Sequence, residues 1–279
     1  MKYIITFAAI IFLCQCKKNP EEPYPNENVV MDNAQAALYF HTIFREVENA
    51  WAFVDSMDYR DGPYPDEASK STFYKKLTYD GNAEIVTIEY NAWETNHLFL
   101  WGTITVSFNV DSYRREGKIA HVLLTDFAIN QQYVEGQVSI KFNKRTGDND
   151  NYTFTLLEGA AIHEYGHAMP VLISCTISNG QYERTEGNKT LIQDDDVWVY
   201  TGVMTGMLHN DPNLKYTNTV NTTSPYEENG VRKDGKIYYS MNCMFAEQGL
   251  SQITIPKRPT IVYLYGCSGY FFESVTHID

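Results

Sequence analysis

The sequence predicts a mainly β fold, built of antiparallel sheets in a sandwich or a meander, with one α-helix near the N-terminus. Beyond about residue 75, apolar and polar residues alternate in one short segment after another, as in strands with one buried face. Clusters of Gly, Asn and Asp separate these segments, and such frequent turns favour antiparallel pairing. One stretch, from 34 to about 55, has instead the three-and-four spacing of a helix.

The first fifteen residues predict an export signal. A charged start is followed by an apolar run from Ile4 to Leu13, which is too short to cross a bilayer as a helix. The run ends in Leu13-Cys14-Gln15-Cys16, which resembles the lipobox of bacterial lipoproteins. We therefore expect a signal peptide over 1–15 and lipid attachment to Cys16, with Cys14 as the alternative acceptor.

Residues 16–32 predict a lipidated tether. They are polar and rich in proline, without the periodicity of a helix or a strand. The basic pair Lys17-Lys18 precedes the acidic pair Glu21-Glu22, and this order resembles the surface-export signal of Bacteroidetes lipoproteins. The expected location is the outer membrane, with the protein facing either the periplasm or the cell surface.

Residues 33–279 predict a single β-rich domain. Its helix, about 34–55, can lay one apolar face on a sheet, and Asp32 or Asn33 is placed to cap its start. Strands are expected from about 75 onward. The clearest candidate segments are 83–90, 103–108, 119–128, 137–142, 197–206, 236–245, 250–255 and 260–265.

Charge excludes one class of partner. The formal net charge is −13, and no basic stripe interrupts this balance, which repels nucleic acid and anionic lipid. We expect no binding to nucleic acid and contact with the membrane only through the lipid anchor. Any ligand is expected to be neutral or cationic.

Three cysteines follow the predicted lipobox, namely Cys175, Cys243 and Cys267. An odd number without a C-x-x-C pattern does not fit a metal knuckle. Cys243 and Cys267 could form a disulfide in an oxidising compartment if their strands are neighbours. Three reduced cysteines are the alternative, and the sequence leaves both open.

The stretch His163-Glu164-Tyr165-Gly166-His167 matches the H-E-x-x-H pattern of zinc peptidases. That chemistry needs a helix, on which both histidines share one face and the glutamate polarises a metal-bound water. Here the flanks 152–156 and 171–177 alternate like strands, and Pro170 would end a helix just after His167. We therefore expect a hairpin with a Tyr165-Gly166 turn, in which Glu164 lies opposite His167 and His163 opposite Ala168.

The zinc-peptidase alternative stays open, with Glu186 or Glu183 as a possible third ligand. The run Asp194-Asp195-Asp196 could bind calcium, although a solvated turn before a strand is the simpler interpretation. No phosphate-loop pattern and no Gly-x-Ser-x-Gly elbow is present. We accordingly predict no catalytic residue, no metal ligand and no cofactor.

Several short segments of the chain are distinctive as a set: Phe44–Ala50, Trp101–Val106, Tyr113–Gly117, Thr125–Phe127, Tyr133–Gly136, 195–202, 258–260 and 265–267. Together they resemble a family of Bacteroidetes β-rich lipoproteins of unknown function. The resemblance covers most of residues 34 to 279 and implies a β-rich surface or periplasmic protein, without implying catalytic residues. This chain departs from the family over 159–174, where family members have a hairpin without paired histidines.

The expected function is that of a lipid-anchored, non-enzymatic binding or structural component of the cell envelope. Aromatic residues make up 14% of the chain, and most of them fit ordinary strand positions. An aromatic cluster exposed on one face would support binding of a glycan or a protein. A helix over 156–169 would instead support hydrolysis.

Overall fold

The structure is a computed structural model of residues 1–279. It describes residues 26–57, 73–95, 98–108, 116–146, 149–156, 161–164, 173–184, 197–208, 211–220, 227–228, 231–232, 235–239, 248–266 and 274–278. The predicted signal peptide and lipid-attachment site lie outside this part of the chain. No helix among the described residues has the length and apolar character needed to cross a membrane.

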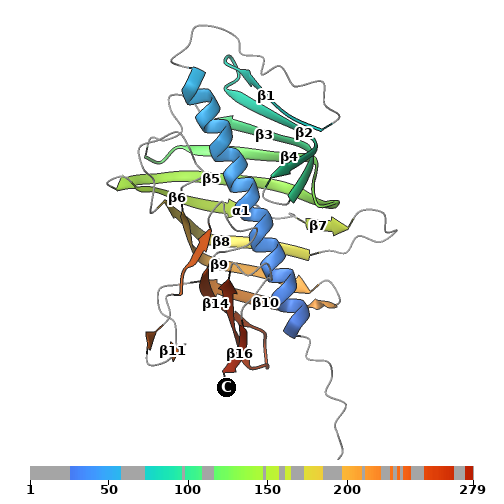
Figure 1. The fold of residues 1–279 in the computed structure, drawn as a ribbon, viewed down its shortest axis with the longest axis vertical. Helices are drawn as coiled ribbons and strands as arrows, with labels where there is room; N and C mark the ends of the chain where they lie inside the picture. The colour runs from blue at the N-terminus through green and yellow to red at the C-terminus, as the bar shows by residue number, and fades with distance from the viewer. Residues whose placement is uncertain are drawn as a thin grey trace, which may run out of the picture.

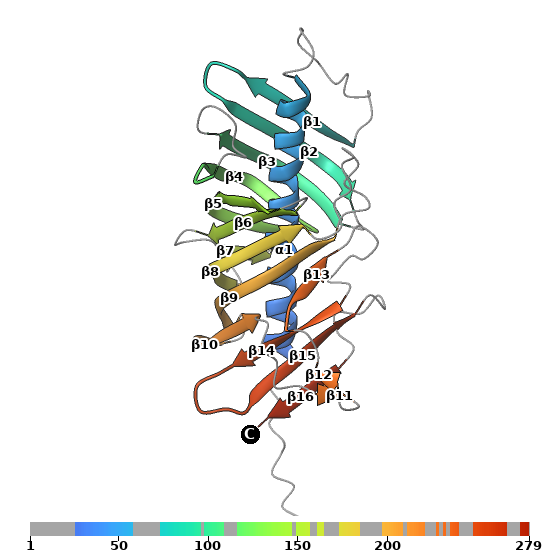
Figure 2. The same cartoon turned by 90° about the vertical axis from the view of Figure 1, so that its left-hand side faces the viewer.

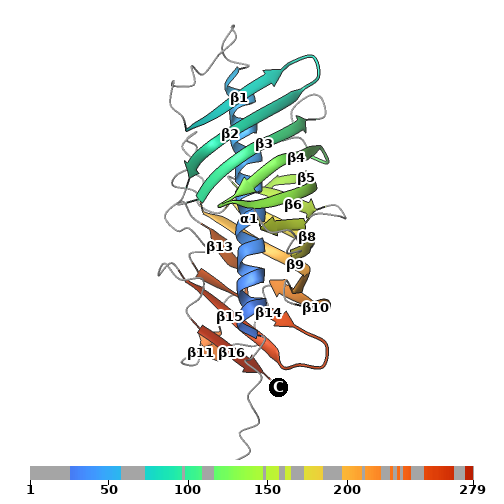
Figure 3. The same cartoon turned by 90° about the vertical axis from the view of Figure 1, so that its right-hand side faces the viewer.

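One long helix, α1 (Asn26–Met57), runs along the long axis of the molecule, and the strands cross it (Figures 1, 2 and 3). It begins eight residues before the predicted start, so Asp32 and Asn33 lie within the helix and not at its cap. Residues 26–32, which we expected in the tether, are helical. After Pro25 this segment contains no proline, so nothing in it prevents the helix from starting earlier.

The helix is central to the fold. All nine residues from Ala36 to Phe44 are buried, and because a turn takes 3.6 residues, every side of the helix is covered there. The helix is therefore covered on more sides than the one apolar face that the sequence predicted to lie on a sheet. Its buried residues include polar ones, among them His41, Glu46 and Glu48.

The described strands form one 14-stranded antiparallel sheet and a separate two-stranded one, β11 (Glu227–Glu228) with β12 (Val231–Arg232). Neighbours in the large sheet mostly follow chain order, so the fold is a meander rather than a sandwich. Its strands are β1 (Tyr74–Asp80), β2 (Ile85–Thr95), β3 (Leu98–Phe108), β4 (Ile119–Ile129), β5 (Gln132–Thr146), β6 (Asn149–Leu156), β7 (Ala161–Glu164), β8 (Ile173–Arg184), β9 (Trp198–Leu208), β10 (Asp211–Val220), β13 (Ile237–Tyr239), β14 (Gln248–Thr254), β15 (Thr260–Gly266) and β16 (Ser274–Ile278).

Two positions in the sheet are each shared by two strands. β6 and β7 both lie between β5 and β8, and both run antiparallel to them, so they occupy one strand line of the sheet. In the same way, β10 and β13 both pair with β9 and β14. The first two residues of the H-E-x-x-H motif therefore lie near the end of a long strand line.

The core follows the helix and changes character along it. Around residues 33–44 the helix packs against aromatic side chains: Phe44 stacks on Tyr182 at 4.2 Å, and His41 stacks on Tyr239 at 3.9 Å. Burial raises the pKa of Tyr239 well above its ordinary value, so this hydroxyl stays neutral. Toward the other end of the helix, strands β2 to β5 contribute a buried face that is mostly aliphatic, with Phe108 edge-on to Trp51 at 5.3 Å. Its fully buried members include Val86, Ile88, Ile104, Val106, Ala120 and Ile140.

Candidate functional site

Strands β3, β4 and β5 carry two rows of residues that face opposite ways. Leu100, Ile129 and Gln132 are cross-strand neighbours and face α1: the first two are fully buried, and the Gln132 carboxamide oxygen accepts hydrogen bonds from two helix side chains. Because neighbours along a strand alternate between faces, the next row, Trp101, Ala128 and Tyr133, faces away from the helix. We call this side of the sheet the outer face.

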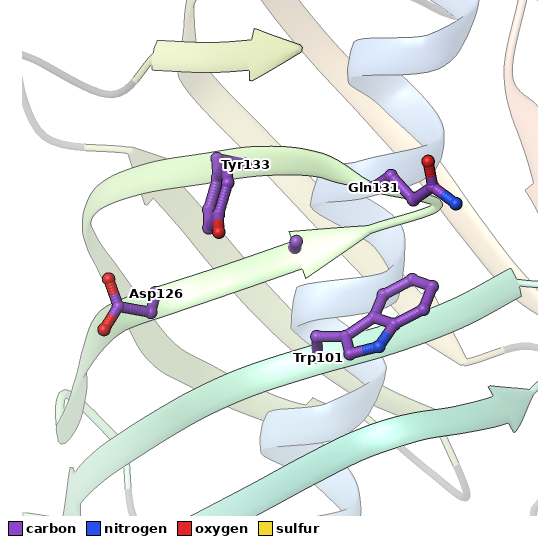
Figure 4. Close-up of a pocket in the computed structure, with 5 residues that line it drawn as sticks. Trp101, Asp126, Gln131 and Tyr133 are labelled. Carbon is purple, nitrogen blue, oxygen red and sulfur yellow. The ribbon is translucent and has the colours of Figure 1, made fainter. Parts of the chain in front are cut away.

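A pocket of about 400 Å³ lies over this second row (Figure 4). Its lining residues are Trp101, Asp126, Ala128, Gln131 and Tyr133. Ala128 is only 5% exposed although it lies on the outer face and outside the main hydrophobic cluster. Ala128, with its small side chain, thus forms the floor of the pocket between the aromatic side chains of Trp101 and Tyr133.

A β-bulge turns Asp126 into the pocket. The ladder shifts register on both sides of it, between Trp101 and Thr103 toward β3 and between Leu124 and Ala128 toward β5. Asp126 has a φ of 48°, and it is exposed together with its neighbour Thr125, which breaks the alternation of β4. Bulges re-aim side chains in this way, and here the result is a carboxylate on the outer face.

The turn between β4 and β5 places Gln131 at another end of the pocket. Asn130 and Gln131 have φ values of 50° and 69°, as a two-residue type I′ hairpin turn requires. The neighbouring strand β3 holds this turn, because the Asn130 N–H donates to the Phe99 carbonyl (2.9 Å) and the Phe99 N–H donates to Asn130 Oδ1 (2.8 Å). The rim of the pocket is therefore fixed by one backbone–backbone hydrogen bond and one hydrogen bond to the Asn130 side chain.

The lining offers recognition groups rather than a catalytic apparatus. Two aromatic rings provide apolar faces, the Asp126 carboxylate accepts hydrogen bonds, and the Gln131 carboxamide can donate and accept. The five lining residues include no Ser, Cys, His or Lys that could act as a nucleophile beside a base. The arrangement can bind a small ligand with both apolar and polar parts.

The inner side of the same sheet carries a buried ion pair. Lys75 Nζ lies 2.5 Å from Glu46 Oε2, and the Tyr90 hydroxyl donates to the same oxygen at 2.5 Å. Burial alone would raise the pKa of Glu46, but the Lys75 ammonium and these hydrogen bonds together lower it. Because Glu46 is enclosed by the core, we assign the pair to stability and not to ligand binding.

The structure partly confirms the expectation for the H-E-x-x-H motif. His163 and Glu164 lie on strand β7 and not on a helix, and β7 and β8 are antiparallel neighbours as predicted. The predicted register is wrong, because Ala161 lies opposite Ser174, whereas a Tyr165-Gly166 turn would place it opposite Pro170. The wrong register would have put a proline, which has no N–H to donate, into the ladder.

The other predicted site residues are mostly outside the described part of the chain. This holds for Cys14, Cys16, His167, Glu186, the run 194–196, Cys243 and Cys267, so the disulfide, lipid and calcium predictions stay predictions. Glu183 is half-buried on β8, opposite Val199 of β9. Within the described residues no group of three or more His, Cys, Asp and Glu is arranged to hold a metal ion.

Sequence reasoning did not single out the pocket residues, although signals for them exist. Trp101 is followed by Gly102 inside a strand, a position that often marks a bulge or a close backbone approach. Thr125-Asp126 puts two polar residues in succession after regular alternation, which also indicates a bulge. Together these signals point to the place where β3 and β4 form the pocket.

No protein-family model matches this chain, no curated protein matches it, and no solved structure matches it. The inferences about function therefore rest on the residues and geometry of the chain itself.

Proposed function

We propose that the protein is a non-enzymatic binding component of the cell envelope, held at the outer membrane by lipid on Cys16. The observation that carries the binding function is the pocket between Trp101 and Tyr133 on the outer face of the sheet. It has a defined floor, a re-aimed carboxylate and a fixed rim, features that pre-organise a site for a ligand. The ligand is a glycan or a protein.

Membership in the family of Bacteroidetes β-rich lipoproteins is part of the same proposal. It rests on the short sequence segments that resemble the family. Three of these segments contain the pocket residues Trp101, Asp126 and Tyr133. The zinc-peptidase alternative loses support, because His163 and Glu164 lie on a strand and lack the helical face that the mechanism needs.

Anchoring is tested with the full-length chain expressed in a Gram-negative host supplied with an alkyne-labelled fatty acid. The protein is expected to take up the label and to sediment with membranes, since two or more acyl chains hold a protein stably at a bilayer. Cys16→Ser should lose the label and release the protein, whereas Cys14→Ser should change neither. A wild-type chain that takes up no label would contradict the anchor, and loss of label in Cys14→Ser alone would move it to Cys14.

A further inference from the structure

We infer that the pocket on the outer face recognises one pyranose ring of a neutral saccharide, a conclusion that rests on the proposed binding function and names its ligand class. A pyranose has a rim of hydroxyl groups and two faces of C–H bonds.

The aromatic side chains are placed to receive the faces of such a ring. Trp101 and Tyr133 belong to strands two positions apart in the sheet, whose backbones are roughly 10 Å from one another. Ala128 lies between them and fills little of that width. C–H bonds carry a partial positive charge and meet the negative face of an aromatic ring favourably, so a sugar can lie over the alanine against either aromatic side chain.

The polar groups lie where the rim of the ring would be. Asp126 lies on β4 and Gln131 in the turn that follows it, with the aromatic row between them (Figure 4). A ligand that uses both must present polar groups on opposite sides and an apolar body in the middle. A compact cation would need only the Asp126 carboxylate and would leave the Gln131 carboxamide without a role. Sugar hydroxyls both donate and accept, so they suit a carboxylate at one end and a carboxamide at the other.

Charge selects among saccharides. Asp126 is exposed in the pocket, and the whole chain carries a formal net charge of −13. Both repel a carboxylate or sulfate on a sugar, and the five lining residues include no Lys or Arg that could pair with one. Neutral sugars are therefore favoured over uronic acids and sulfated sugars.

The test uses NMR to follow the indole N–H signals of the ¹⁵N-labelled protein, which has four tryptophans. Trp101→Phe assigns the signal of Trp101. The probes are the methyl pyranosides of glucose, galactose, mannose and N-acetylglucosamine, the corresponding free sugars, glucuronic acid and tetramethylammonium chloride, each at millimolar concentration. We expect a saturable shift of the Trp101 signal with at least one neutral sugar and none with glucuronic acid.

Variants then connect binding to the site. Tyr133→Ala and Asp126→Ala are each expected to weaken that sugar about tenfold, since one ring or one hydrogen-bonded group contributes about this much. Leu123→Ala is the matched control on the same strand and face, because Leu123 is exposed but does not line the pocket, and it should leave affinity unchanged. If Asp126→Ala is poorly folded, Asp126→Asn replaces it, and its circular dichroism spectrum is compared with wild type.

Binding of methyl glycosides and free sugars alike would identify the terminal residue of a glycan, while binding of free sugars alone would identify a monosaccharide. A Trp101 signal that responds to tetramethylammonium and to no sugar would overturn the saccharide and leave the binding function standing. A signal that responds to no probe, or a sugar whose affinity is the same in all variants, would also overturn it. Membrane attachment through Cys16 is measured separately, so failure of the envelope proposal is distinguishable from failure of the saccharide.

Discussion

Gly102 lies against the carbonyl group of Asp126, so closely that a Cβ atom on Gly102 would be 2.1 Å from the carbonyl oxygen. Real Cβ atoms do not approach a backbone oxygen this closely, and the neighbour is main chain that cannot swing away. Only glycine therefore allows β3 to pass the bulge of β4. The aim of the pocket carboxylate depends in this way on a residue in another strand.

Gly102→Ala is expected to destabilise the protein by about 3 kcal/mol, because it adds this contact to the strain of a positive φ. Gly117→Ala is the matched control. The two glycines have nearly equal φ values, +85° and +83°, but no atom of the described residues lies within 4 Å of a Cβ on Gly117. Gly117→Ala should therefore lower the free energy of unfolding by about 1 kcal/mol, because only the backbone conformation is strained. Urea unfolding of both variants measures the difference, and equal losses would show that β3 and β4 are not in contact as described.

Much of the fold could be predicted from periodicity. Alternation indicated β2, β3, β4, β5, β9, β14 and β15, and in β2 half-buried and buried residues do alternate from Ile85 to Tyr90. Strand β10 was missed, since its inward positions Leu214, Tyr216 and Val220 are interrupted by Asn218, which is fully buried. A polar residue at an inward position hides the period on which the prediction depends.

The candidate site was harder to predict for a physical reason. A pocket on a sheet face is made by residues that are neighbours across strands, and cross-strand register is not visible in one sequence. Trp101 and Tyr133 are 32 positions apart in sequence, yet they share one row through Ala128. The bulge signals at Gly102 and Asp126 could locate an irregularity, but they could not tell which aromatic side chains stand beside it.

Purified protein is expected to contain no stoichiometric zinc. His163 and Glu164 are consecutive residues of β7, and a strand does not give residues 163, 164 and 167 the common face that an H-E-x-x-H site uses. Elemental analysis after dialysis against buffered zinc measures the content, and His163→Ala with His167→Ala is the comparison. One tightly held zinc per chain that disappears in the double variant would contradict the strand and restore the peptidase hypothesis.

Lys75→Met is expected to destabilise the protein by about 3 kcal/mol, because it leaves the buried Glu46 carboxylate without its cation. The side chains of Lys75 and Glu46 are 15% and 3% exposed. The adjacent pair, Lys76 with Glu89 at 3.2 Å, is 46% and 41% exposed, so Lys76→Met is the control and should cost less than about 1 kcal/mol.

Adding Glu46→Gln to Lys75→Met should recover part of the loss, since no buried charge then remains unpaired. Denaturant unfolding of the single and double variants gives the coupling energy. Equal losses of stability in Lys75→Met and Lys76→Met would mean that the Lys75–Glu46 pair is as well solvated as the Lys76–Glu89 pair.

His41 should make folding stability depend on pH between neutral and mildly acidic conditions. Burial, reinforced by the charge of Arg45, lowers the pKa of His41 well below its ordinary 6.5. The imidazole stacks on Tyr239, and its Nδ1 atom has no hydrogen-bond partner among the described residues. The folded state therefore keeps His41 neutral, whereas the unfolded chain takes up a proton below pH 6.5. Stability is thus fully present above that pH and is lost as the pH falls, by about 1.4 kcal/mol per pH unit until the folded pKa is reached.

His41→Phe keeps a ring on Tyr239 and removes the titration. We expect wild type to lose about 1.4 kcal/mol more than this variant between pH 7.5 and pH 5.5, measured by urea unfolding at both values. His121→Gln is the control, because that imidazole is exposed on the outer face beside Ser139 and remains in solvent in the folded state. It should keep the wild-type pH dependence.

The pH window from 7.5 to 5.5 lies above the ordinary pKa of carboxyl groups, so the lowered pKa of Glu46 does not contribute to the pH dependence there. If His41→Phe and wild type lose equal stability across the window, His41 is not enclosed as a neutral side chain between the helix and the tyrosines.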